Sequence, residues 1–184
     1  MSQNNIAFML LSSLYFFLPA YVANMMPVFV KKINFLNYPV DFNKEWRGIR
    51  ILGDHKTWRG LFFGTLSGFI TFELQRLLYR NGLLSEFAQI NYSEAPLFLG
   101  VILGFSALFG DLLKSFFKRR WGIRPGKPWV PFDQLDFIIT AIILTAHWSN
   151  ITIKDALLTI GVVFLLTMVV QYTGYKLKFK SDKL

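Results

Sequence analysis

Residues 95–120 read APLFLGVILGFSALFGDLLKSFFKRR, and this stretch decides the fold class. Its apolar part is as long as a helix that crosses a hydrocarbon core, which needs about 20 residues. One carboxylate, Asp111, interrupts the apolar run shortly before it ends in Lys118, Arg119 and Arg120. An ionisable side chain inside a membrane costs at least about 2.5–3.5 kcal/mol on insertion scales, so we expect Asp111 to have a functional role.

The composition extends this interpretation to the whole chain. Of 184 residues, 53% are hydrophobic, including 20 Phe and 5 Trp, and the apolar residues fall in separate blocks. We therefore predict an all-α polytopic membrane protein in which residues 1–184 form a single transmembrane domain. The five predicted transmembrane helices cover approximately residues 6–30, 60–79, 95–117, 131–148 and 156–175. The absence of cysteine excludes disulfides, thiol chemistry and cysteine-bound metals.

The Lys and Arg residues indicate the direction in which these helices cross. Nearly all of the 20 basic residues fall in loops 31–59 and 118–130, in the C-terminal tail or at the adjoining end of a span. The exceptions are Arg76, Arg80 and Lys154. The positive-inside rule then places the N-terminus outside, and the C-terminus and both loops in the cytosol, in a multi-pass protein of the cell membrane. This topology accounts for the net charge of +9, so no nucleic-acid partner is needed.

Three carboxylates are expected to meet at the cytosolic face. Asp111 lies near the cytosolic end of the third span, and Asp133 and Asp136 lie in the first turns of the fourth. Carboxylate oxygens are ligands that Mg²⁺ prefers, usually together with phosphate oxygens of a substrate. We therefore predict that these acids hold Mg²⁺, and the sequence leaves a second cation open. The alternatives are a helix cap for Asp133 and a buried ion pair of Asp111 with Lys114 or Lys118.

Basic side chains surround these acids on the predicted cytosolic face. Lys118 and Arg119 end the third span, and Lys127 follows in the next loop. A metal with basic side chains is typical of phosphoryl-group chemistry, in which positioning and charge neutralisation supply most of the catalysis. A second basic segment, residues 50–60, is flanked by glycines and could cover the phosphates of a nucleotide. The alternatives are snorkelling residues at the membrane boundary and a loop held against anionic lipid.

The order of these residues resembles a known signature, that of the membrane-integral phosphatidate cytidylyltransferases, or CDP-diacylglycerol synthases. That signature joins a Gly-Asp, a Ser, a Lys-Arg pair and a closing Asp-x-x-Asp, which here are Gly110-Asp111, Ser115, Lys118-Arg119 and Asp133-x-x-Asp136. The chain departs from the bacterial pattern in its short length, in Gln134 after the first acid of the pair, and in lacking a Gly-His-Gly-Gly tract. It looks closer to the archaeal branch, the CDP-archaeol synthases.

The resemblance implies a CTP-dependent transferase. The phosphate of unsaturated archaetidic acid, 2,3-di-O-geranylgeranylglycerol 1-phosphate, would attack the α-phosphorus of CTP to give CDP-archaeol and pyrophosphate, with Mg²⁺ required. By position, Asp111, Asp133 and Asp136 would hold the metal, and Lys118 would act with them in catalysis. The residues expected to contact CTP or its phosphates are Ser115, Lys118, Arg119, Lys127, Lys56, Thr57 and Arg59.

Other functions remain open at this point. A CTP-dependent polyprenol or lipid kinase would use similar residues, but attack at the γ-phosphorus would release CDP instead of pyrophosphate. A CDP-alcohol phosphotransferase is disfavoured, because the chain has a single Asp-x-x-Asp and no glycine after it. A small non-enzymatic transporter is poorly supported, because the fifth span is nearly free of charge. The lipid tails, the number of metal ions and the oligomeric state do not follow from the residues themselves.

Overall fold

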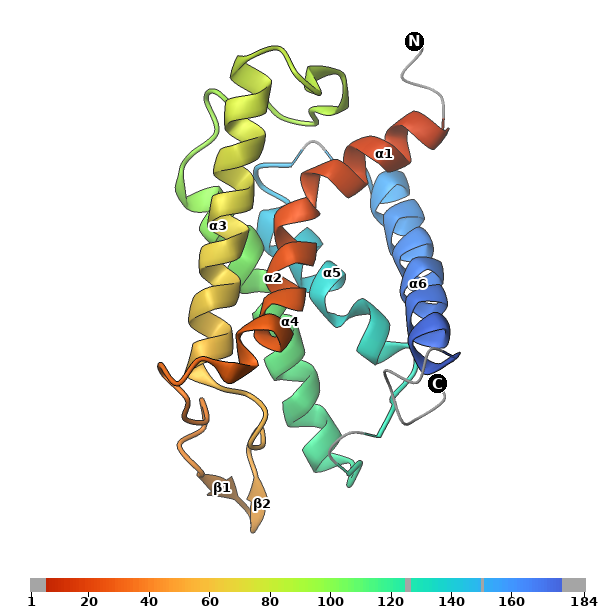
Figure 1. The fold of residues 1–184 in the computed structure, drawn as a ribbon. Helices are drawn as coiled ribbons and strands as arrows, with labels where there is room; N and C mark the ends of the chain where they lie inside the picture. The colour runs from red at the N-terminus through yellow and green to blue at the C-terminus, as the bar shows by residue number, and fades with distance from the viewer. Residues whose placement is uncertain (1–5, 125–126, 150, 177–184) are drawn as a thin grey trace.

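The computed structural model describes residues 6–124, 127–149 and 151–176. It consists mainly of helices, and one long ordered loop separates η1 from α3 (Figure 1). The helices are α1 (Ile6–Phe16), α2 (Leu18–Phe29), η1 (Val30–Lys32), α3 (Trp58–Arg80), η2 (Ser85–Phe87), α4 (Phe98–Arg120), α5 (Phe132–Thr145) and α6 (Ile153–Lys176). Strands β1 (Glu45–Trp46) and β2 (Ile49–Arg50) form an antiparallel pair. The predominantly helical fold predicted from the sequence is confirmed. Most of the basic tail, residues 177–184, lies outside the described residues.

Each predicted span corresponds to one helix or, for the first, to a pair. Within the described residues, α4 and the Ile153–Val170 part of α6 are long and apolar enough to cross a membrane. α1 and α2 would add a third candidate span if the bent pair is counted as a single span. α5 has 14 residues, about 21 Å of helix, and is shorter than the predicted span 131–148. The count of five spans and their orientation therefore remain predictions.

α1 and α2 meet at a bend of 50°, whereas the sequence predicts one continuous span over residues 6–30. Pro19, in the first turn of α2, has no N–H to donate to the carbonyl of Tyr15, four residues earlier. The side chain of Gln75 from α3 donates its Nε2 hydrogen to that carbonyl instead. Gln75 is buried, so the carbonyl of Tyr15 has a partner at the bend, and this hydrogen bond joins α1 to α3.

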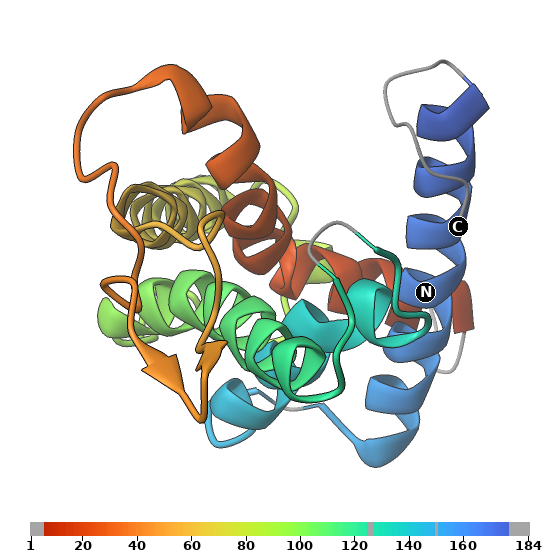
Figure 2. The same ribbon diagram turned by 90° about the horizontal axis from the view of Figure 1, so that it is seen from below.

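α4 is the central helix, because it packs against α2, α3 and α5. α6 lies on the opposite side of the molecule from α3 (Figures 1 and 2). Two glycines permit the close contacts of α4. A Cβ atom at Gly104 would overlap the backbone of α3, and one at Gly110 would overlap the carbonyl oxygen of Asp136 and the hydroxyl of Thr140 in α5. Because Gly110 directly precedes Asp111, this contact also brings the acids of α4 and α5 together.

The segment between η1 and α3 is an ordered loop that contains the β1–β2 hairpin, which the sequence did not predict. Arg47 and Gly48 have φ values of 56° and 71°, as a tight two-residue hairpin turn requires. Arg120 of α4 donates to the carbonyl of Trp46 (3.1 Å) and lies over its ring. The same ring stacks on Phe116 of α4. These contacts hold the loop against the C-terminal half of α4.

Candidate active site

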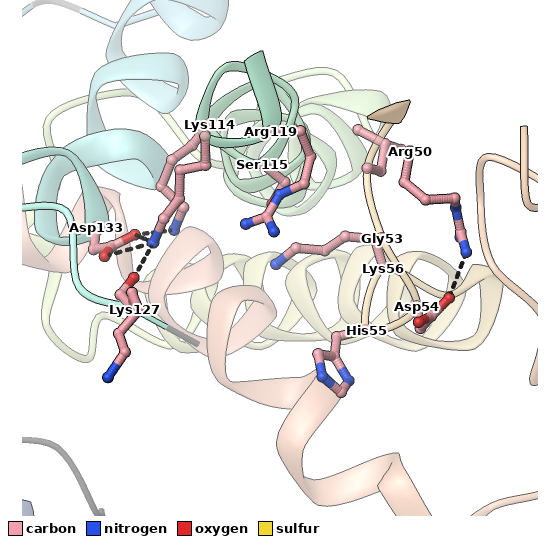
Figure 3. A pocket seen from close by; sticks show the side chains of 12 residues that line it. Arg50, Gly53, Asp54, His55, Lys56, Lys114, Ser115, Arg119, Lys127 and Asp133 are labelled. Carbon is pink, nitrogen blue, oxygen red and sulfur yellow. Dashed lines mark hydrogen bonds and ion pairs between the residues drawn. The ribbon is translucent and has the colours of Figure 1, made fainter. Parts of the chain in front are cut away.

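A basic cavity of about 400 Å³ lies between this loop and the C-terminal half of α4. Lys56, from the loop, and Arg119, from α4, both extend into it (Figure 3). The described lining consists of Arg50, Leu52, Gly53, Asp54, His55, Lys56, Lys114, Ser115, Lys118, Arg119, Lys127 and Asp133. Half of these residues are Lys or Arg, so the cavity attracts a polyanion.

One stripe of α4 supplies the centre of the site. Asp111, Lys114, Ser115 and Lys118 are spaced i, i+3, i+4 and i+7, and residues at this spacing share a helix face. The hydroxyl of Ser115 donates to the backbone carbonyl of Asp111 (2.8 Å), so its hydrogen is already engaged within the helix. The stripe therefore presents Lys114, Ser115 and Lys118 to the cavity, with Asp111 one turn earlier on the same helix face.

The structure brings together Asp111, Asp133 and Asp136 around a lysine. The Nζ atom of Lys114 lies 3.1 Å from Asp111 Oδ1, 3.2 Å from Asp133 Oδ1 and 2.7 Å from Asp136 Oδ2. The sequence left a buried pair of Asp111 with Lys114 as an alternative, and the structure contains this pair in a partly buried position. Lys56 forms a further ion pair with Asp111 and thereby joins the long loop to α4.

Lys118 forms a second link between α4 and α5. Its Nζ atom lies 3.0 and 3.1 Å from the two carboxylate oxygens of Asp133, and 2.6 Å from the carbonyl oxygen of Lys127. Asp133 also accepts the backbone N–H of Trp129, four residues earlier (2.6 Å). Asp133 thus has both an ionic partner and a backbone partner, and it fixes the start of α5 beside the cavity.

Asp41 shapes the part of the long loop that lines the cavity. Its side chain is 1% exposed and accepts the backbone N–H groups of Leu52 (2.9 Å) and Gly53 (3.1 Å). It also accepts a hydrogen bond from the guanidinium of Arg50 (2.9 Å). Burial raises the pKa of the Asp41 carboxyl, but these hydrogen bonds outweigh it and hold the pKa below its ordinary value. Asp41 is therefore charged at neutral pH and fixes the backbone of the cavity wall.

Two predicted phosphate contacts, Thr57 and Arg59, lie elsewhere. Thr57 is the N-cap of α3, and its Oγ1 atom accepts the backbone N–H of Gly60 (3.2 Å). Arg59 is buried, and its guanidinium donates to the backbone carbonyl of Ile33. Neither residue belongs to the described lining of the cavity. Both side chains are engaged at the start of α3, Thr57 with the helix backbone and Arg59 with the end of η1, so their contacts with CTP stay predictions.

The sequence did not single out six residues of the described lining: Lys114, Arg50, Leu52, Gly53, Asp54 and His55. The last five belong to segment 50–60, which was expected only as a whole to cover the phosphates of a nucleotide. A signal for Lys114 was present, because it lies at i+3 from Asp111 on the stripe that contains Ser115. Arg50 and His55 are brought to the cavity by the fold of the long loop. That fold depends on contacts between distant residues, which helical periodicity does not predict.

An apolar groove of about 410 Å³ adjoins the basic cavity on the side where α4 meets α5. Its wall includes Phe117, Trp121 and Phe132, which are exposed at the protein surface. Lys114 lines both the groove and the basic cavity, and Asp136 also lines the groove. The polar and apolar spaces therefore meet at the acid cluster.

A metal ion was predicted at these acids. As placed, the described residues contain no group of three or more His, Cys, Asp or Glu side chains that could hold a metal ion. The ammonium of Lys114 occupies the central position instead. The donor set fits a divalent cation in its chemistry, because three carboxylates already surround one positive charge and Mg²⁺ prefers oxygen ligands. Binding would require Lys114 to move, and the assignment of Mg²⁺ to Asp111, Asp133 and Asp136 remains a prediction.

Comparison with known proteins gives one consistent result. The model of the CarS-like family, CDP-archaeol synthase, matches residues 6–183. The CDP-archaeol synthase of Pyrococcus furiosus is 35% identical over 94% of this chain and 96% of its own length. That of Archaeoglobus fulgidus is 33% identical over 94% of this chain and 97% of its own.

A solved structure agrees with these relatives. It is that of an intramembrane enzyme of archaeal membrane lipid biosynthesis, with a TM-score of 0.67 and 31% sequence identity. The match covers 86% of this chain and 91% of the solved one. The resemblance inferred from the signature residues is confirmed. The comparisons support an enzyme and not a transporter. The chain therefore belongs to the CDP-archaeol synthase family of enzymes.

Proposed function

We propose that this protein transfers the CMP group of CTP to the phosphate of unsaturated archaetidic acid, which yields CDP-archaeol and pyrophosphate. The reaction takes place at the cytosolic face of the cell membrane and depends on Mg²⁺. The observation that carries this proposal is the meeting of a basic cavity and an apolar groove at Lys114. A triphosphate fits the first space and the tails of a lipid fit the second, so the two reacting groups would meet at the acid cluster.

The reaction needs little proton transfer from the protein. A phosphate oxygen of the lipid forms a bond to the α-phosphorus of CTP, while the bond from that phosphorus to the β-phosphate oxygen breaks and pyrophosphate leaves. The attacking phosphate is already an anion at neutral pH, so no general base is required. The histidine in the described cavity lining, His55, lies on the long loop, and Figure 3 shows it apart from Asp133.

The side chains of the site act mainly by positioning and by neutralising charge. Lys56, Lys118, Arg119 and Lys127 line the cavity and would pair with the phosphates of CTP, including the charge that develops on the leaving pyrophosphate. Asp111, Asp133 and Asp136 would hold the divalent cation, which neutralises further phosphate charge when it is bound. The aromatic wall of the groove would hold the lipid beside them and limit the access of water.

Product analysis with purified protein tests this proposal. The protein is incubated with CTP, Mg²⁺ and either the diether lipid phosphate or a diacyl lipid phosphate, and pyrophosphate and CDP-lipid are measured. We expect both products with the diether lipid, in equal amounts. Release of CDP and phosphorylation of the lipid would instead support the kinase.

Substitution of the acids tests the site. Asp133→Asn and Asp136→Asn remove negative charge without changing side-chain size, and we expect each to reduce turnover by roughly 100-fold or more. Glu86→Gln is the matched control, because Glu86 is an exposed carboxylate on the turn after α3 and lies outside the described lining of the cavity. Full turnover by the two Asn variants would contradict the assignment of the acids.

A further inference from the structure

Lys114 lies where a cation held by all three acids would lie. Its Nζ atom is within 3.2 Å of a carboxylate oxygen of Asp111, of Asp133 and of Asp136. The Lys114 side chain is only 13% exposed, so these acids, and not bulk water, stabilise its charge. A divalent cation and this ammonium repel each other at such distances and cannot share the position.

The charges of the cluster are balanced before any ligand binds. Asp111 pairs with Lys56, Asp133 pairs with Lys118, and Lys114 contacts all three acids. A free divalent cation would therefore add two positive charges to a group of acids that already has an ammonium for each carboxylate. A nucleotide triphosphate that enters with the cation brings the negative charge that restores the balance. Metal and nucleotide should therefore bind together.

Lys114 also faces the two spaces proposed for the substrates. Its side chain lines both the basic cavity and the apolar groove, and a lysine ammonium on its flexible four-carbon stem can rotate between acceptors. We propose that Lys114 is an internal counter-ion. It keeps free divalent metal out of the acid cluster, and it turns to the substrate phosphates when metal and nucleotide bind together. This inference rests on the proposed function, because it takes the nucleotide triphosphate to be the ligand of the basic cavity.

A purely structural salt bridge would behave differently. If Lys114 only held α4 to α5, its removal would loosen the cluster and weaken the binding of metal and of nucleotide alike. If Lys114 is a counter-ion, its removal leaves three carboxylates with two lysines and an open centre. Metal binding should then become stronger while nucleotide binding becomes weaker, and opposite changes in the two affinities separate the alternatives.

The experiment compares the wild-type protein with Lys114→Met in lipid nanodiscs. Binding of Mn²⁺ without nucleotide is measured by the loss of the EPR signal of free Mn²⁺. Binding of radiolabelled CTP is measured separately at saturating Mn²⁺, in nanodiscs that contain no lipid phosphate acceptor, so that no turnover occurs. We expect Lys114→Met to bind Mn²⁺ at least tenfold more tightly than the wild type, and CTP at least threefold more weakly. Neither measurement involves turnover, so failure of this inference is distinguishable from failure of the cytidylyl transfer.

Two further variants make the result specific. Lys154→Met removes an exposed lysine at the start of α6 and should change neither affinity. Lys114→Met combined with Asp136→Asn should lose the gain in Mn²⁺ affinity, which locates the ion at the acids. If Lys114→Met does not fold, Lys114→Gln, which is also uncharged, serves in its place with the same expected directions. Mn²⁺ affinity equal to or below that of the wild type in the folded variant would overturn the inference.

Discussion

Gly110 sets the distance between the two helices that carry the acids. With no side chain at this position, the backbone of α4 lies directly against the carbonyl oxygen of Asp136 and the hydroxyl of Thr140. The next residue along the chain is Asp111, so the separation of the helices at Gly110 also decides how close the carboxylates come. The glycine of the Gly-Asp signature therefore has a packing role, and the aspartate after it has the electrostatic one.

Gly110→Ala should damage both stability and activity. The added methyl would overlap α5, and overpacking of this kind costs typically about 1–3 kcal/mol. We expect a lower midpoint of thermal unfolding and at least a tenfold loss of pyrophosphate formation, because the acids of α4 and α5 are pushed apart. Gly161→Ala in α6 is the control, since its Cβ would meet open space, and it should leave both quantities nearly unchanged. Wild-type activity in Gly110→Ala would show that the helix separation is not critical.

Among single residues, the sequence predicted the acids better than their partners. Asp111, Asp133 and Asp136 could be grouped, because helical spacing and a common membrane face place them together. Lys114 was predicted only as one possible ion-pair partner of Asp111. Its central position depends on the close packing of α4 against α5, which the sequence does not determine.

At the scale of elements, the long loop is built around a buried acid. Asp41 binds two backbone N–H groups and the side chain of Arg50, so one carboxylate fixes the segment that leads to Lys56. The sequence indicated a loop over residues 31–59, but it gave no reason to choose Asp41 over Asp54 as its centre. The distinction is one of burial, because the Asp41 side chain is 1% exposed and that of Asp54 is 76% exposed.

Asp41→Asn should weaken CTP binding more than it slows the chemical step. The amide cannot accept as strongly from Leu52, Gly53 and Arg50, so the cavity wall loosens while the acids of α4 and α5 stay in place. We expect the KM for CTP to rise at least threefold and kcat to change by less than a factor of two. Glu45→Gln, an exposed residue of the same loop outside the described lining of the cavity, should change neither value. Equal losses in kcat for Asp41→Asn would indicate a wider structural role.

The pH dependence of the loop follows from the same carboxyl group. The pKa of Asp41 is below its ordinary value of 3.8, so its contribution to stability is complete above pH 3.8. That contribution is lost as the pH falls further, through the pKa of the folded state. Limited proteolysis of the loop with an acid-active protease should therefore become faster only below about pH 4. This acceleration at low pH should be missing in Asp41→Asn.

At the scale of the whole molecule, the helical class and the order of the spans followed from the blocks of apolar residues. The bend between α1 and α2 did not, because Pro19 is tolerated in the first turn of a helix and gives no sign by itself that the chain turns there. The bend also depends on Gln75, which lies far away in the sequence and supplies the missing hydrogen bond to Tyr15. Contacts of this kind belong to the folded molecule and have no local pattern.

The orientation in the membrane can be tested directly, because the chain contains no cysteine. Lys44→Cys places a thiol on the exposed long loop, and Glu86→Cys places one on the exposed turn after α3. In intact cells, an impermeant maleimide should label Glu86→Cys, whereas Lys44→Cys should react only after the membrane is opened. The reverse pattern would place the basic cavity outside the cell and contradict the proposed access of CTP from the cytosol.

The side-by-side arrangement of the basic cavity and the apolar groove has a consequence for product departure. In the proposed reaction, pyrophosphate would leave the basic cavity toward the cytosol, and the nucleotide-bearing lipid would move into the bilayer past Phe117 and Phe132, which line the apolar groove. Neither product would have to pass through the space of the other, so the two products would leave by separate routes.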